Sequence, residues 1–132
     1  MLAYLQIGTN RWDNVHFADL SDLYLLVLEK ALSERSTGQF SSDPYERFHF
    51  AAVGSFAHGD VARLIAPVLY EHKLVDSPEA VSVPPEELPF YLAVNSKSVA
   101  NRSFNDGWKP HAPTYESSVA DEVEATLKAL GL

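Results

Sequence analysis

The pattern of apolar and polar positions predicts two strands and a helix in the first third of the chain. Residues 3–7, AYLQI, are rich in β-forming side chains and stop at Gly8, which suits a turn, so a short strand is expected. A second extended piece is expected at 14–17, NVHF. From Asp19 the apolar positions recur at helical spacing, which predicts a helix that runs to about Glu34.

Asp19 is the expected N-cap of this first helix, because its carboxylate can accept hydrogen bonds from the free N–H groups of the first turn. Asp22, three residues later, complements the helix dipole. The stretch NRWDNVHFADLSDLY, at 10–24, is therefore interpreted first as a strand-to-helix junction and only second as a candidate site.

The middle of the chain predicts a strand followed by a longer helix. Residues 45–53, YERFHFAAV, alternate in polarity and are expected to form a strand that Gly54 ends. Ser55 is the expected cap of a helix over about 57–75, whose apolar residues lie on one side. Pro67 falls inside this helix and removes a backbone hydrogen bond, so we expect a kink or two shorter helices.

The last third predicts one short strand and two helices. The strand is expected at 80–83 and is followed by a proline-rich connection that contains a helical turn. Ser96 is the expected cap of a helix over 97–106. The closing helix is expected at 115–130, behind Thr114 as its cap.

Composition fits one globular domain. Hydrophobic residues make up 46% of the chain and charged residues 21%, without a low-complexity tract or an internal repeat. A chain of this size can bury roughly 68% of its unfolded surface, so one core is feasible. We expect a single mixed α/β domain over residues 1–132, in which a small sheet of short strands is covered by about four helices.

Charge and cysteine content exclude several classes of function. The net charge is −8, and no basic run is interleaved with aromatic residues as nucleic-acid binding requires. The absence of cysteine excludes disulfides, thiolate catalysis and zinc sites built on sulfur. The longest apolar run, LYLLVL, is too short to span a bilayer, and the opening residues do not resemble a leader. We expect a cytoplasmic protein without nucleic-acid or membrane partners.

Three stretches make the chain similar to a known family. They are NRWDNVHFADLSDLYLLVLEKAL, FAAVGSFAHGDVARLIAPVL and NSKSVANRSFNDGWKP, followed by an acidic helix. Together they resemble the C-terminal part of the extended short-chain dehydrogenases, the NAD-dependent epimerase and dehydratase family, and its fungal members in particular. VHFADLSDLY is similar to the family's Val-His-Val-x-Asp-Leu-Ala segment, and NRSFNDGWKP to its Arg-x-x-x-Leu-Gly-Trp-x-Pro segment. The resemblance covers nearly the whole chain and implies a substrate-binding lobe laid against a dinucleotide-binding sheet.

Two elements of that family are missing from the sequence. There is no G-x-x-G-x-x-G turn to let the backbone approach a pyrophosphate, and no tyrosine is followed four residues later by lysine. We therefore expect no cofactor and no redox chemistry from this chain alone. A lobe without its dinucleotide-binding half exposes an apolar face, so we expect a homodimer or larger oligomer through that face. The alternative is an excised piece, or a split-gene product that needs a Rossmann partner.

Two histidines are candidate acid–base groups. The resemblance implies that His16 is structural, bonded to the backbone or to a neighbouring aspartate, but His16 with Asp19 one turn away could also act as general acid or base. His16, Asp19 and Asp22 also form a weak metal-ligand pattern, which a helix start explains equally well, so no metal is expected. His58 stands beside Asp60 near the start of the second helix and is the other candidate.

Arg11, Trp12 and Arg102 are the candidate substrate-binding residues. Arg11 and Trp12 precede His16 where members of the resembled family often contact substrate, and an indole with a guanidinium suits an aromatic or carboxylated ligand. Packing of the indole on a neighbouring helix explains Trp12 equally well. Arg102, in the C-terminal motif, is expected to face either a ligand or a carboxylate.

Two classes of function stay open. In the first, the protein is a small non-redox enzyme of secondary metabolism, a cyclase, isomerase or dehydratase. It would hold a small organic substrate in the repurposed pocket and use His16, Asp19 and His58 as acid–base residues. In the second, it is a non-catalytic binding or assembly module, or one half of a split NAD-dependent epimerase. A cavity with converging histidine and aspartate side chains would favour catalysis.

Overall fold

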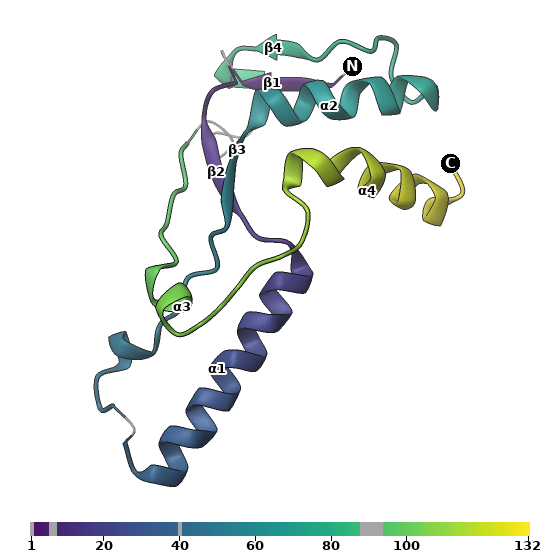
Figure 1. Ribbon diagram of the computed structural model, residues 1–132. Coiled ribbons are helices and arrows are strands. Elements are labelled where there is room, and N and C mark those ends of the chain that lie inside the picture. The colour runs from purple at the N-terminus through teal and green to yellow at the C-terminus, as the bar shows by residue number, and fades with distance from the viewer. Residues whose placement is uncertain (1, 6–7, 40, 88–93) are drawn as a thin grey trace.

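The computed structural model describes residues 2–5, 8–39, 41–87 and 94–132. Its described residues form a mixed α/β structure with four α-helices and several short strands, as expected from the sequence (Figure 1). Along the chain the elements are β1 (Ala3–Leu5), β2 (Arg11–Asn14), α1 (Phe17–Thr37), the 3₁₀ turn η1 (Pro44–Arg47), β3 (Gly54–Ala57), α2 (His58–Glu71), β4 (Val81–Val83), the 3₁₀ turn η2 (Pro85–Glu87), α3 (Asn101–Asn105) and α4 (Tyr115–Leu130).

The strands are divided between two small sheets rather than joined in one. β1 pairs in parallel with β4, and β2 pairs antiparallel with β3. In the second pair Arg11 lies opposite Ala57 and Asn14 opposite Gly54. An isolated bridge from Trp12 to Ser96 adds a further contact to β2.

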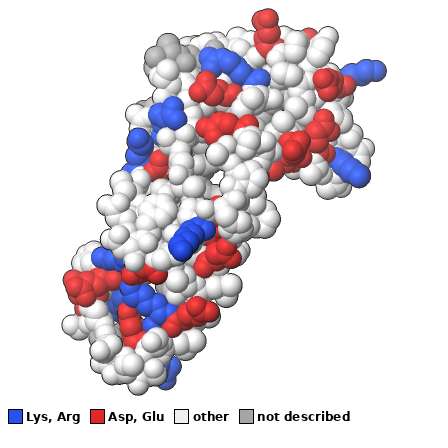
Figure 2. All heavy atoms as spheres, in the orientation of Figure 1, with Lys and Arg blue, Asp and Glu red and all other residues white. Residues whose placement is uncertain are grey.

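The antiparallel ribbon of β2 and β3 connects two ends of the molecule. β1, β4, α2 and α4 lie together at one end, whereas α1 extends away toward the other, with α3 and η1 beside it (Figure 1). On the face shown in Figure 2, acidic and basic side chains are interspersed around the lower part of the molecule. In the arrangement of Figure 1, few other elements lie against the long helix α1.

One cluster of buried residues joins α1 to the later part of the chain. Leu23 of α1 packs with Ala100 and Trp108, and each of the three is at most 4% exposed. Partly buried side chains surround this cluster, including Leu26 and Val27 of the same helix. Burial of a leucine side chain contributes about 1.5–3 kcal/mol, so this cluster anchors one side of α1 to the rest of the chain.

The first helix begins earlier and ends later than the sequence predicts. His16, not Asp19, is its N-cap: the His16 backbone is extended, and Nδ1 accepts a hydrogen bond from the Ala18 N–H at 3.2 Å. The prediction for Asp19 is wrong because its carboxylate points away from the helix end, toward the connection before α4. The helix continues to Thr37, and the extended piece expected at 14–17 lies at 11–14.

The strand predicted at 45–53 is also wrong. Pro44 begins η1 instead, and Asp43 caps that turn through the N–H of Tyr45 at 2.8 Å, an arrangement that proline at the first helical position favours. Gly54 begins β3 rather than ending a strand, and Ser55 lies inside β3 and caps no helix.

The second half of the chain follows the predictions more closely. α2 is a single helix that contains Pro67, so the alternative of two helices is wrong. The strand at 80–83 and the helix at 115–130 are confirmed as β4 and α4. The helix expected at 97–106 covers only 101–105, and Ser96 does not cap it. Within the described part of the chain, no helix combines the length and apolar character that crossing a membrane requires.

Candidate functional site

The three predicted acid–base residues do not form one cluster. His16 and Asp19 lie at the start of α1, whereas His58 begins α2. His16 comes just after β2 and His58 just after β3, and because these strands are antiparallel their ends lie at opposite ends of the ribbon. Four paired residues separate these ends by about 10 Å. A shared acid–base centre of His16 and His58 is therefore not supported by the geometry.

In the structure His16 caps the first turn of α1. Its Nδ1 accepts a hydrogen bond from the Ala18 N–H at 3.2 Å, and its ring lies against Phe17 with ring centroids 4.6 Å apart. An imidazole nitrogen that accepts carries no proton, so this hydrogen bond selects the neutral tautomer with the proton on Nε2. The cap therefore fixes both the orientation and the tautomer of the ring.

The Asp19 carboxylate is buried and accepts hydrogen bonds from the backbone of a distant segment. Its side chain is 2% exposed, and Oδ1 accepts hydrogen bonds from the N–H groups of His111 at 2.8 Å and Ala112 at 3.1 Å. The carbonyl oxygen of Asp19 also accepts from Nε1 of Trp108 at 2.8 Å. A buried carboxylate needs such donors to offset its lost hydration. Asp19 therefore ties α1 to the connection that leads into α4.

His111, rather than His16, lies close to the carboxylates of Asp19 and Asp22. Nδ1 of His111 lies 3.4 Å from Oδ1 of Asp19 and 3.6 Å from Oδ2 of Asp22, while His16 is engaged as a cap. Each of these three residues could offer one ligand atom to a metal ion. Because Asp19 is already bonded to two backbone N–H groups, we interpret the cluster as part of the same structural tie and assign no metal to it.

His58 belongs to a row of aromatic rings. Its ring meets Trp12 edge-on at 4.9 Å and Phe56 at 5.3 Å, and Phe56 in turn contacts Tyr115 at 4.7 Å. Burial lowers the pKa of His58, and its buried Nε2 makes no hydrogen bond within the described residues. The neutral imidazole thus packs as an aromatic side chain between the ribbon and α2.

Arg11 and Trp12 make contacts that hold the ribbon together. The Arg11 guanidinium donates to Oγ of Ser55 at 3.1 Å and to the Ser55 carbonyl at 2.7 Å. Nε1 of Trp12 donates to the Val94 carbonyl at 2.8 Å. The Arg11 guanidinium and the Trp12 indole N–H thus both form hydrogen bonds within the chain. The predicted role of the two residues in substrate binding stays a prediction.

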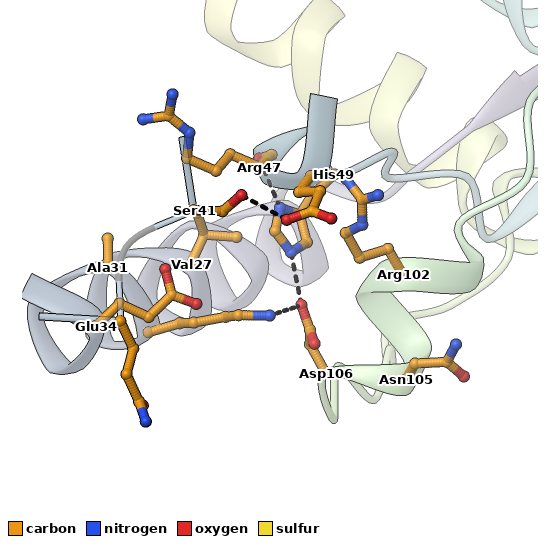
Figure 3. A pocket seen from close by; sticks show the side chains of 12 residues that line it. Val27, Ala31, Glu34, Ser41, Arg47, His49, Arg102, Asn105 and Asp106 are labelled. Carbon is orange, nitrogen blue, oxygen red and sulfur yellow. Dashed lines mark hydrogen bonds and ion pairs between the residues drawn. The ribbon is translucent and has the colours of Figure 1, made fainter. Parts of the chain in front are cut away.

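Arg102 lies at a cleft of about 670 Å³ between α1, η1 and α3. Figure 3 shows the side chains around it, among them His49 and Asp106. Nζ of Lys30, in α1, donates to Oδ2 of Asp106 at 2.6 Å. Arg102 donates from Nη1 to the carbonyl oxygens of Tyr45 at 2.5 Å and Phe48 at 2.8 Å. It therefore fixes η1 and the residue that follows it, and no carboxylate among the described residues forms an ion pair with Arg102.

The Asp106 carboxylate contacts both Lys30 and His49 in this cleft. Its Oδ2 lies 2.6 Å from Nζ of Lys30 and 2.8 Å from Nε2 of His49 (Figure 3). The hydrogen bond from Lys30, and after it that from His49, lowers the pKa of Asp106 against the opposing effect of burial. Nδ1 of His49 faces the Arg47 carbonyl at 3.0 Å, so both ring nitrogens face acceptors and the protonated imidazolium fits this arrangement.

The sequence offered no signal for this network. Lys30 and Asp106 are 76 positions apart, and His49 and Asp106 are 57 apart. His49 lies in the segment 45–53, where the predicted strand does not form. Because Asp106 follows α3, Lys30 belongs to α1 and His49 follows η1, the network ties η1 and α3 to α1.

A second pocket, of about 330 Å³, lies where α1 and α4 begin. His16 lines this pocket together with four other polar side chains, those of Asn14, Tyr115, Ser118 and Glu122. Oγ of Ser118 donates to Oε1 of Glu122 at 2.7 Å. Burial, and to a lesser extent the Glu122 carboxylate, raises the pKa of Tyr115.

The N-terminus of α2 does not offer an open site for the pyrophosphate of a dinucleotide. A pyrophosphate needs glycines that leave a helix N-terminus open. Here the N–H of Gly59, in the first turn of α2, donates to the Gly8 carbonyl at 3.0 Å. A Cβ on Gly59 would lie 3.0 Å from both Cα and O of Gly8. The lack of a side chain at Gly59 therefore lets the backbone of Gly8, rather than a pyrophosphate, approach the start of α2.

Comparison of the chain with protein-family profiles, with curated proteins and with solved structures found no match. The resemblance to the extended short-chain dehydrogenases rests on the motifs quoted above.

Proposed function

We propose that this chain is a ligand-binding lobe that works within a larger assembly, docked through α1 onto a dinucleotide-binding half of the extended short-chain dehydrogenase type. This is the second of the two classes that the sequence left open. The observation that carries the proposal is that α1 is apolar on two opposite sides and only one of them is covered.

The covered side of α1 carries Leu23, Leu26 and Val27, which belong to the core cluster. The other side carries large apolar residues that are more than half exposed, and we call it the outer α1 face: Phe17 77%, Tyr24 69%, Leu25 59%, Leu28 55% and Leu32 57%. At about 100° per residue these five side chains fall within an arc of about 100°. A helix that is apolar on both sides is typical of a protein interior, not of a surface.

Burial of the outer α1 face would contribute favourably to docking. Full burial of each of these side chains contributes about 1.5–3 kcal/mol, so covering the exposed part of all five contributes about 5–10 kcal/mol before the cost of association. A further hollow beside Ala31, Leu32 and Arg35 continues the face toward the end of α1. The resemblance assigns the covering partner to a dinucleotide-binding half, and a second copy of this chain is the competing occupant.

Stand-alone, cofactor-independent catalysis is the second candidate function. The observation that favours it is the pocket beside His16, since Tyr115 and Glu122 line the same cavity. The geometry supports it less well because Asp19 is bonded to the backbone and His58 lies at the other end of the ribbon.

Site-specific photo-crosslinking tests the docking proposal. With p-benzoylphenylalanine in place of Leu28, the chain in its source cells should crosslink to a polypeptide segment that carries a glycine-rich dinucleotide-binding turn. The same probe at Ser33, which is exposed on another side of α1, is the matched control and should not. A crosslink only to a second copy of the chain, or equal crosslinking from both positions, would overturn the assignment of the partner.

A further inference from the structure

The pocket between the starts of α1 and α4 is lined by both hydrogen-bond donors and hydrogen-bond acceptors. Its volume of about 330 Å³ is at the small end of the range for ligand sites, so it suits a molecule of about ten heavy atoms. Val15, Phe17 and Pro113 supply apolar surface, and the polar side chains stand among them. This mixture of an apolar wall with a few polar groups is typical of small-molecule sites.

His16 lines this pocket, and its ring has a second nitrogen that can donate a hydrogen bond. Its Nδ1 is engaged by the Ala18 N–H, which leaves the proton on Nε2. Nε2 makes no hydrogen bond with another residue in the part of the chain that the structure describes. A ligand oxygen can therefore accept from Nε2–H without disturbing the cap of α1.

Glu122 supplies a negative acceptor on the α4 side. One of its oxygens, Oε1, is held by Oγ of Ser118 at 2.7 Å, which orients the carboxylate. Tyr115 stands beside it as a neutral phenol, with its ring fixed against Phe56 at 4.7 Å. With no lysine or arginine among the described residues that line the pocket, this carboxylate favours a cation over an anion.

We propose that this pocket binds a small amine that also carries a hydroxyl group on an apolar or aromatic frame, with the ammonium at Glu122 and the hydroxyl oxygen at Nε2 of His16. The inference does not depend on docking through the outer α1 face. It identifies a ligand class that neither the resemblance nor the comparisons supply.

Binding of tyramine, measured by calorimetry and by amide chemical shifts, tests the proposal. We expect tyramine to bind and to shift residues 14–18 and 113–122, while the matched anion 4-hydroxyphenylacetate binds at least about tenfold more weakly. Glu122→Gln should weaken tyramine about tenfold or more, because a hydrogen bond to a charged group is lost. Glu116→Gln, an exposed acid in the first turn of the same helix, is the control and should bind tyramine as the wild type does.

The His16 contact is tested with a second pair of ligands. His16→Ser keeps a good N-cap and removes the ring with its Nε2–H donor, so α1 should stay folded by circular dichroism. The wild type should prefer tyramine over phenethylamine, which lacks the hydroxyl, and His16→Ser should lose that preference. Equal binding of 4-hydroxyphenylacetate and tyramine, no effect of Glu122→Gln, or an unchanged preference in His16→Ser would overturn the proposal.

Discussion

Replacement of Asp19 by alanine should destabilise the protein strongly although Asp19 was first selected as a catalytic candidate. Its carboxylate accepts from the N–H groups of His111 and Ala112 at 2.8 and 3.1 Å and is 2% exposed. Hydrogen bonds to a charged acceptor contribute about 1.5–3 kcal/mol each, and both would be lost together. Water that reaches the half-exposed connection recovers part of this loss, so we expect a decrease of about 2–4 kcal/mol in the free energy of unfolding.

Two further variants separate the charge from the geometry. Asp19→Asn keeps an acceptor oxygen but not the negative charge, so it should lose about 1–2 kcal/mol. Asp22→Ala, in the same turn with a side chain 52% exposed, should lose no more than about 0.5 kcal/mol.

Urea unfolding followed by far-ultraviolet circular dichroism measures all three variants against the wild type. An effect of about 2–4 kcal/mol is a large part of the about 5–15 kcal/mol that holds a typical domain folded, so it is readily measured. If Asp19→Ala unfolded within about 0.5 kcal/mol of the wild type, the structural assignment of Asp19 would be refuted and its catalytic reading would regain support.

Three other predictions follow from particular contacts. The pKa of Asp106 in the folded protein is lowered below the ordinary 3.8, so the Asp106 carboxylate adds stability above that pH, and the added stability should disappear as the pH falls through the folded pKa. Measurement of the free energy of unfolding as a function of acid pH should show this loss, and Asp106→Asn should abolish the pH dependence. Gly59→Ala should cost about 1–3 kcal/mol in thermal unfolding, because its Cβ would meet the Gly8 backbone at 3.0 Å; unchanged stability would show that Gly8 can move. Leu28→Glu should reduce binding of an apolar dye and self-association of the isolated chain, as seen by fluorescence and light scattering, without loss of helix; a chain that already binds no dye would contradict an uncovered apolar face.

The elements with a strong local pattern were predictable from the sequence. α1, α2 and α4 have apolar positions at helical spacing, and β4 is bounded by proline and turn residues, so local periodicity sufficed. The exact starts were not predictable for α1 and α2, since a histidine cap at His16 and an uncapped start at His58 follow from the path of the preceding strands.

The predicted strand at 45–53 shows where local pattern fails. Phe48 and Phe50 alternate with polar residues as in a strand, but both are about 60% exposed and no strand pairs with them among the described residues. Pro44 and Asp43 instead favour a 3₁₀ turn. Alternation predicts a strand only where a second strand is available to pair with it.

The candidate site residues were partly predictable. His16 was selected and does line a pocket, but its partners Tyr115 and Glu122 come from a helix about 100 positions later in the chain. Asp19 and His58 were selected for their proximity in sequence to helix starts, and the fold engages one with backbone donors and the other with aromatic rings. Such groupings depend on contacts between distant segments, which local periodicity does not encode.

Hydroxyl-radical footprinting of two tyrosines tests the central claim, that α1 is covered on its outer face in the working protein, most directly. Tyr24 on the outer α1 face is 69% exposed and Tyr45 in η1 is 76% exposed, so both should be labelled at similar rates in the isolated chain. In the assembly purified from its source, Tyr24 should be protected while Tyr45 stays reactive. Equal labelling of Tyr24 and Tyr45 in that assembly would contradict the account.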